Sequence, residues 1–291
     1  MKAHFHLPGL FEYYDLYRKF LPLFYNHRDY FYDWVEIESI YGAPMNCIWS
    51  GGRIGINEIN PYEVRNLMNT YNISSRLTFS NSLLNEKHLE DMKCNELCRI
   101  FEQANNGIII YSDLLLEYIR STYPKFYFVS STTKVLTDFN DFIKEVNKDE
   151  FKYVVADFRF NKSFDQLKEI EHKEKVEFLC NECCWIGCKE RKECYEAVSH
   201  QNLKEDFNFV CKAPNFENGY QFSKAIENPS FISIEDIQSI YLPMGFNQFK
   251  IEGRGLGSAL ILEFLLYYLT KPQYQIHVRE AIYLDNMLDL F

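Results

Sequence analysis

The stretch GIIIYSDLLLEYIRSTYPKFYFVSS, residues 107–131, decides the fold class. A short apolar run, GIIIY, precedes a segment with apolar residues at helical spacing, and a second apolar run, FYFVSS, follows it. Ser112 and Asp113 stand where the start of a helix is expected, because Ser and Asp favour N-terminal caps. Two short apolar strands joined by a helix indicate a parallel unit whose sheet is covered on both faces.

The same alternation of strand and helix recurs along the chain. One helix is expected to begin after Asn60, which is placed as a cap, with Pro61 at its first position. About eight such units predict an α/β fold, a (β/α)8 TIM-like barrel, with a doubly wound open sheet as the alternative. The strands are expected at 45–49, 75–80, 107–111, 126–131, 152–158, 176–180 and 247–253, with one more at 207–212 or 230–234.

The first part of the chain differs from the rest in its high content of aromatic residues. Residues 10–34, LFEYYDLYRKFLPLFYNHRDYFYDW, are rich in Phe and Tyr spread over more than one helical face. We therefore expect residues 1–35 to be an N-terminal helical extension and residues 36–291 to be the barrel domain. Such aromatics must bury against the barrel, a second subunit or an apolar ligand, so a homodimer or a partner protein is a further expectation.

Composition and charge exclude several classes of protein. The formal net charge of -10 argues against a general binder of the nucleic-acid backbone, which gains affinity from clustered Lys and Arg. No stretch has the length and apolarity of a membrane span, and the first residues do not read as a secretory signal. The expected location is the reducing cytoplasm, where nine cysteines, an odd number, seldom form a disulfide framework.

Five of those cysteines fall within CNECCWIGCKERKEC, residues 180–194. Clustered thiolates with one more arriving from elsewhere suit an iron–sulfur cluster, and structural zinc is the alternative. Cys180 and Cys183 are spares, either of which could replace a ligand. The expected ligands of a 4Fe–4S cluster are Cys184, Cys188, Cys194 and Cys211.

Three further cysteines lie far from this cluster in the sequence. Cys94 and Cys98 are four residues apart on an expected helix, where they could face a metal. Cys47 lies in an expected strand. Because buried free cysteine is common, the favoured interpretation of all three is core filling.

Polar residues at the ends of the expected strands form the candidate site, because barrel enzymes carry their chemistry there. In QFKIEGR, alternation places Lys250, Glu252 and Arg254 on one face of a strand. These three are the candidate catalytic residues, with a buried salt-bridge network as the alternative interpretation. The candidate substrate-binding residues are Arg53, Asn81, Asp157, Arg159, Asn181 and Glu182.

With these residues placed, the sequence resembles a known family. Residues Lys250 to Arg254 resemble the KIEGR hallmark of the peptidase U32 family, the collagenase-like proteins. Residues 231–249 resemble the helix that precedes this hallmark. A further segment, N-E-x-C-x3-C-x2-R, is similar to cysteine segments of family relatives and comprises Asn181, Glu182, Cys184, Cys188 and Arg191.

The resemblance implies a TIM-like barrel with a 4Fe–4S cluster held by four cysteines. The family is described as peptidases but also contains oxygen-independent hydroxylases of RNA bases and of quinone precursors. Redox or hydroxylation chemistry on a small-molecule or RNA-borne substrate is therefore the first functional expectation. The second is a peptidase-like or non-catalytic binding barrel with a structural metal site. The expected first strand lacks the family's glycine-rich opening, so the substrate is not carried over.

Overall fold

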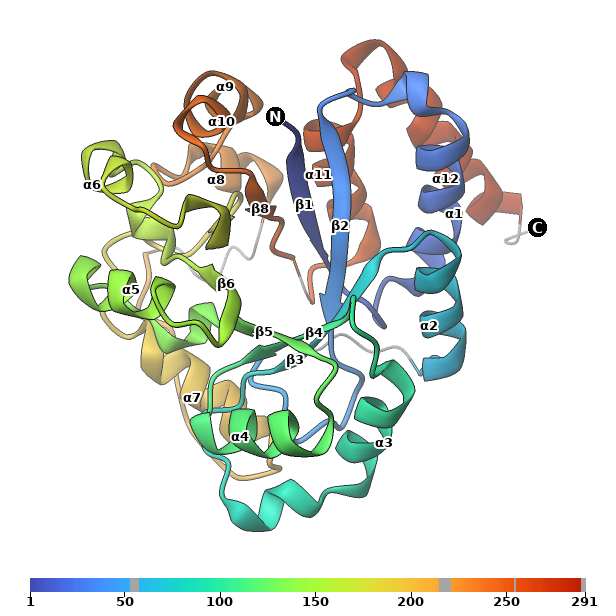
Figure 1. Cartoon of the computed structure of the whole chain (residues 1–291). Coiled ribbons are helices and arrows are strands. Elements are labelled where there is room, and N and C mark those ends of the chain that lie inside the picture. The colour runs from blue at the N-terminus through green and yellow to red at the C-terminus, as the bar shows by residue number, and fades with distance from the viewer. Residues whose placement is uncertain (53–57, 215–220, 254, 289–291) are drawn as a thin grey trace.

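Eight parallel strands close into a barrel in a computed structural model that describes residues 1–52, 58–214, 221–253 and 255–288. Each strand pairs with the next one in the chain, and β8 pairs with β1 (Figure 1). The predicted (β/α)8 barrel is thereby confirmed. The strands are β1 (Ala3–Pro8), β2 (Val35–Gly42), β3 (Ser74–Phe79), β4 (Gly107–Ile110), β5 (Tyr127–Ser130), β6 (Phe151–Val155), β7 (Val176–Leu179) and β8 (Gln248–Lys250).

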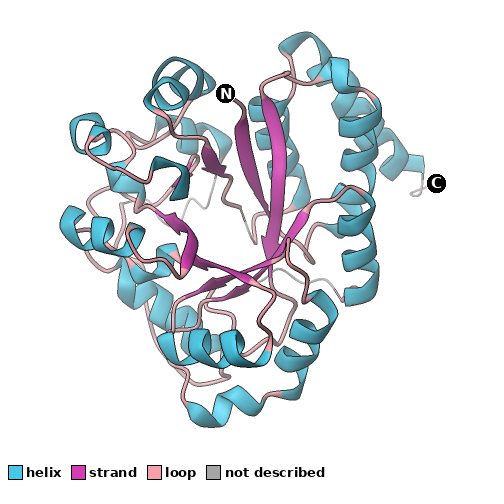
Figure 2. Ribbon diagram, viewed as in Figure 1, coloured by secondary structure: helices cyan, strands magenta, loops and turns pink. Residues whose placement is uncertain are grey.

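Helices form the outer layer around this barrel (Figure 2). The α-helices are α1 (Tyr14–Asn26), α2 (Pro61–Thr70), α3 (Met92–Phe101), α4 (Asp113–Thr122), α5 (Phe139–Val146), α6 (Phe164–Lys168), α7 (Arg191–Asn202), α8 (Phe222–Glu227), α9 (Ile234–Asp236), α10 (Leu242–Met244), α11 (Ser258–Leu269) and α12 (Gln275–Leu288). Short 3-10 turns are η1 (Arg28–Tyr30), η2 (Glu86–Glu90), η3 (Thr132–Lys134), η4 (Phe158–Phe160), η5 (Lys173–Lys175) and η8 (Pro272–Tyr274), and η7 (Ile237–Tyr241) is a π-helix. None of the described helices has the length and apolar character of a membrane span, as expected.

Local sequence explains where the helices begin. Ser112 caps α4, its hydroxyl accepting a hydrogen bond from the Leu115 amide at 3.4 Å. The Asn60 side chain caps α2 by accepting from the Tyr62 amide at 3.0 Å, and Pro61 occupies the first turn. Both helix starts follow the sequence prediction, because a cap satisfies amides that no helical carbonyl reaches.

The division at residue 35 is wrong. Residues 1–35 are not an extension, because they supply β1 and α1, the first strand and helix of the barrel. Strand β1, AHFHLP, and strand β2, VEIESIYG, alternate polar and apolar residues instead of forming an apolar run. A search for apolar runs passes over such strands, although period-two alternation is also a strand signal.

The strand expected at 45–49 is wrong as well. These residues form the loop between β2 and α2. The strand expected at 207–212 or 230–234 is also absent from the described structure of those segments. The other six strands lie at or within two residues of the expected starts, because their apolar runs are buried on both faces.

The outer apolar core lies between the barrel and its helices. The aromatic residues of α1 pack there, with Tyr17, Phe20 and Phe24 fully buried. The ring of Phe24 packs against that of Phe31 in a tilted arrangement, with 4.8 Å between their centroids. Helix α12 lies beside α1 (Figure 1). Most of the N-terminal aromatic surface is thus covered within this chain, and a homodimer through it stays a prediction.

The interior of the barrel carries a layer of charged side chains. The Glu177 carboxylate accepts from Arg76 Nη1 at 2.5 Å and from Lys250 Nζ at 3.0 Å. Arg76 Nε also donates to the Tyr127 hydroxyl at 2.9 Å, and His6 Nε2 lies 3.5 Å from Glu177 Oε2. His6, Arg76, Tyr127 and Glu177 come from alternate strands, as in the side-chain layers of TIM barrels.

Burial makes this ion layer depend on complete pairing. Burial opposes ionisation of Glu177, but the neighbouring His6, Lys250 and Arg76 more than offset it and lower the pKa of the carboxyl. Burial and Arg76 together lower the pKa of His6 to about 3, so its imidazole is neutral. One carboxylate therefore serves two buried cations, and removing it leaves both uncompensated.

We predict that Glu177→Gln lowers the free energy of unfolding by about 3 to 5 kcal/mol, because Arg76 and Lys250 lose their common anion. Urea denaturation at pH 7 measures this change. The matched control is Asp165→Asn, which breaks an exposed ion pair with Lys168 in α6 and costs about 0.5 kcal/mol or less. An equal effect of the two substitutions would show that the buried layer does not stabilise the barrel.

Candidate functional site

Polar side chains meet at the carboxyl ends of β7 and β8. Asn181, two residues after β7, forms hydrogen bonds with both the carbonyl and the amide of Glu252. Its Nδ2 donates to the Glu252 carbonyl at 2.9 Å, and its Oδ1 accepts from the Glu252 amide at 2.7 Å. The main chain at Glu252 is thereby fixed against the start of the cysteine-rich loop.

The Glu182 carboxylate is fully buried beside this contact. Its Oε1 accepts from the amides of Cys183 and Cys184 at 3.0 and 2.9 Å, and its Oε2 accepts from Arg191 Nη2 at 2.5 Å. Burial alone would raise the pKa of Glu182. The Arg191 guanidinium and a hydrogen bond from Glu252 nevertheless lower that pKa to about 2.

Glu182 and Glu252 therefore form a carboxyl pair. A hydrogen bond between two carboxyl groups requires a proton on one of them. The lowered pKa of Glu182 marks it as the ionised member of this pair. Glu252 is only half-buried, whereas Glu182 is buried. The pair thus places a buried anion beside a more exposed carboxyl, and such a difference in surroundings is how acid and base roles are divided.

Arg191, the first residue of α7, holds the pair in place. Its Nη2 also donates to the Tyr195 hydroxyl at 2.8 Å, one turn along the helix. Its guanidinium lies 4.7 Å from the ring centre of Phe158. These contacts fix a cation beside Glu182 without exposing it to solvent, since Arg191 is 3% exposed.

Asp157 and Arg159 hold the cysteine-rich loop over the barrel. Arg159 Nη1 donates to both carboxylate oxygens of Asp157 at 2.8 Å. Its other nitrogens donate to the carbonyls of Ile186, at 3.1 Å, and of Cys188. The two residues are brought to the mouth as predicted, but they serve the loop, and their role in substrate binding stays a prediction.

The remaining candidate residues lie elsewhere. Lys250 is buried one layer below the mouth in its pair with Glu177, as the alternative of a buried salt-bridge network anticipated. Asn81 is also buried, and its Nδ2 donates to the carbonyls of Ile48 and Ser199 at 2.8 and 3.2 Å. Asn81 therefore joins the loop after β2 to α7. Arg53 and Arg254 lie outside the described residues.

The four predicted cysteine ligands do not converge. Cys184 packs against the inner apolar cluster of the barrel, which contains Val155 and Leu179, and burial raises the pKa of its thiol. Cys188, Cys194 and Cys211 are partly buried. Within the described ranges, no three side chains of His, Cys, Asp or Glu gather as a metal site. The four thiols therefore form no preassembled site, and the cluster stays a prediction.

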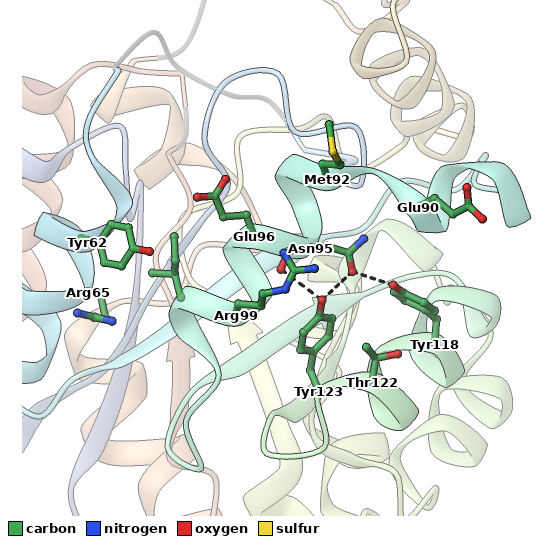
Figure 3. Close-up of a pocket in the computed structure, with 11 residues that line it drawn as sticks. Tyr62, Arg65, Glu90, Met92, Asn95, Glu96, Arg99, Tyr118, Thr122 and Tyr123 are labelled. Atoms are coloured by element: carbon green, nitrogen blue, oxygen red, sulfur yellow. Dashed lines mark hydrogen bonds between the residues drawn. The ribbon is translucent and has the colours of Figure 1, made fainter.

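A surface hollow of about 800 Å³ lies outside the barrel, away from the mouth. Figure 3 shows its wall of polar side chains from α2, α3 and α4. At its floor, Asn95 Oδ1 accepts from the hydroxyls of Tyr118 and Tyr123, both at 2.8 Å. Asn95 Nδ2 donates to two main-chain carbonyls, so this amide is satisfied without a ligand.

Several residues at or below the mouth were missed from the sequence. Arg76 and Glu177 stand as single charges inside apolar strand runs, and such an isolated charge is a signal for an inward pair. Tyr195 gave no such signal, because its place near Glu182 depends on how α7 lies over the barrel.

Comparison with known proteins finds a likeness in fold. No family model and no curated protein matches the sequence. The U32 peptidase Mk0906 has a similar structure, with a TM-score of 0.51 at 10% identity over 86% of this chain and 92% of that one. The spore cortex-lytic enzyme SleL of Bacillus cereus gives a TM-score of 0.36 at 9% identity over 91% and 73%. The first match shows that this chain shares the fold of a U32 peptidase, the family that the KIEGR segment resembles.

The lowered pKa of Glu182 predicts how acid affects stability. Because its folded-state value of about 2 lies below the usual 4.5, ionised Glu182 stabilises the fold above about pH 4.5. This contribution is lost as the pH falls from 4.5 towards 2. Glu182→Gln should therefore cost about 3 kcal/mol at pH 7, leaving Arg191 unpaired, and much less at pH 3.

Urea denaturation of both proteins at pH 7 and pH 3 tests this prediction. Glu227→Gln, at the exposed end of α8, is the control and should change stability little at either pH. A difference between wild type and Glu182→Gln that stays constant with pH would contradict it.

Proposed function

We propose that this chain is a (β/α)8-barrel enzyme whose reaction centre is the Glu182–Glu252 pair at the mouth. The observation that carries the proposal is the half-buried carboxyl of Glu252 beside the buried, ionised Glu182 and its partner Arg191. In barrel enzymes, catalytic groups come from the loops after the strands, which is where both residues lie.

The two carboxyl groups would have different tasks. Glu252 would act as a general acid and donate its proton to a substrate that reaches the mouth. Glu182 would not touch the substrate, because its oxygens are held by two amides and by Arg191. It is a positioning residue that orients Glu252 and stabilises its proton.

Amide hydrolysis is the reaction class to test first. Cleavage of an amide requires a proton for the departing nitrogen, which a neutral carboxyl can supply. The fold likeness to a U32 peptidase favours peptides as the substrate class. A cytoplasmic location, expected from the cysteine content, is part of this proposal.

We predict that Glu252→Gln reduces the turnover of a cleaved peptide at least about 100-fold, because the amide side chain cannot donate a catalytic proton. The thermal midpoint should change little, since the Asn181 contacts involve only the main chain of residue 252. Glu227→Gln serves as the control. Turnover within about twofold of wild type would exclude Glu252 as the acid.

We infer a second candidate function in which the cysteine-rich loop closes on an iron–sulfur cluster or a zinc ion. The ion pair of Lys212 with Glu190, at 2.5 Å, favours it because it brings the segment of Cys211 to the end of the loop that carries Cys188, next to α7, which carries Cys194. Redox or hydroxylation chemistry on a small-molecule or RNA-borne substrate would follow from a cluster.

Metal analysis separates the two metals and tests the ligand set. We expect iron and acid-labile sulfide near four per chain after anaerobic purification, as a 4Fe–4S cluster requires. Ser substitution of Cys184, Cys188, Cys194 or Cys211 should lose most of the iron, while Cys98→Ser should keep it. One zinc and no sulfide would favour a structural site, and full iron in Cys184→Ser and Cys188→Ser would refute the assignment.

A further inference from the structure

A pair of thiols lies in the outer core, on elements other than the cysteine-rich loop. The sulfur atoms of Cys47 and Cys94 are 3.3 Å apart, and both residues are fully buried. Cys47 belongs to the loop between β2 and α2, and Cys94 to the first turn of α3. Core filling explains their burial, but it does not require two sulfurs in direct contact.

Hydrogen bonds hold the two segments against each other. Lys93 Nζ donates to the Met45 carbonyl at 3.0 Å, which joins the neighbours of both thiols. Asp91 caps α3 by accepting from the Cys94 amide at 2.8 Å. A disulfide has a sulfur–sulfur distance of about 2.05 Å, so the two sulfurs need to approach by roughly 1.3 Å. Cys47 lies on a loop, which adjusts more easily than a helix.

The surface next to the pair is hollowed. A cavity of about 480 Å³ is lined by Met45 and Asn46, which precede Cys47, and by Lys93 and Leu97, which flank Cys94. Asn46 and Lys93 are exposed to solvent. The lining of this cavity therefore includes the residue just before each thiol, Asn46 and Lys93, and the cavity is the side from which a small oxidant would approach.

We propose that Cys47 and Cys94 form a reversible disulfide when the protein meets a peroxide. The thiolate of one cysteine attacks an oxygen of hydrogen peroxide, which gives a sulfenic acid and, after protonation of the leaving hydroxide, one water. The second thiol then attacks the sulfenic sulfur, and the sulfur–sulfur bond forms as a second water leaves. Two thiols are oxidised by two electrons and one peroxide is reduced to two waters.

Burial controls the rate of this reaction. Burial, together with the hydrogen bond to Cys47, raises the pKa of the Cys94 thiol, so little thiolate is present at pH 7. Oxidation should therefore be slow at neutral pH and faster at higher pH. A slow response distinguishes this pair from an exposed thiol, which peroxide modifies first.

The disulfide would restrain a large part of the barrel. It would join the loop after β2 to α3 across the segment that carries α2 and β3. Closing a long loop stabilises a protein chiefly by restricting its unfolded chain. We expect the thermal midpoint of the oxidised protein to rise by about 5 °C or more.

Peptide mapping tests the proposal on the whole chain. The protein is treated with hydrogen peroxide at pH 7 and pH 9, its remaining thiols are blocked, and it is digested without reductant. We expect a linked peptide that contains Cys47 and Cys94, formed faster at pH 9 and removed by dithiothreitol. Free thiols at both positions after the cysteines of residues 180–194 have been oxidised would overturn the proposal.

Three single substitutions sharpen this result. Cys47→Ala and Cys94→Ala should abolish the linked peptide and the rise in the thermal midpoint. Cys98→Ala is the matched control, because Cys98 is equally buried one turn further along α3, and it should retain both. A linkage of Cys47 to Cys98 instead of Cys94 would also overturn the assignment. The wild-type map decides the matter even if an alanine variant fails to fold.

Discussion

The Glu177 carboxylate in the middle of the barrel is the constraint on which the site depends. It pairs with Arg76 from β3 and Lys250 from β8, so one buried anion joins distant parts of the sheet. Side chains alternate along a strand, so an inward Lys250 also directs Glu252, two residues on, to the barrel mouth. By the same alternation, Glu177, Leu179 and Asn181 point to the same side of the chain. The ion layer thus sets the register that brings Asn181 and Glu252 together.

Buried charged side chains occur at two levels of the barrel, in the layer around Glu177 and at the mouth around Glu182. In the lower layer His6, Arg76, Glu177 and Lys250 are buried, and the charges fix strand positions. At the mouth, Glu182 and Arg191 are buried, but Glu252 is only half-buried. A buried carboxylate is costly unless cations and amides compensate it, and Glu182 has both. In the proposed function, Glu252 is therefore the member of the pair that meets the substrate.

The cysteines also divide into two groups by their surroundings. Those of the loop after β7 are partly buried near the mouth, apart from Cys180, which is fully buried. Cys47 and Cys94 lie in the outer core, where their sulfurs touch. The dense spacing of residues 180–194 suggests shared chemistry in the sequence, whereas the contact of Cys47 with Cys94 has no counterpart there. Proximity in sequence therefore did not reveal which thiols lie together.

The sequence alone determined the fold class, six of the strands and the caps of α2 and α4, because apolar runs and capping residues act locally. It did not reveal β1 and β2, whose alternating polar residues face a charged interior that only the closed barrel creates. It proposed Glu182 and Glu252 as site residues, but their pairing and the burial of Lys250 came from tertiary structure. The physical reason is that protonation and ion pairing depend on groups brought together across the barrel, and no local pattern records those distances.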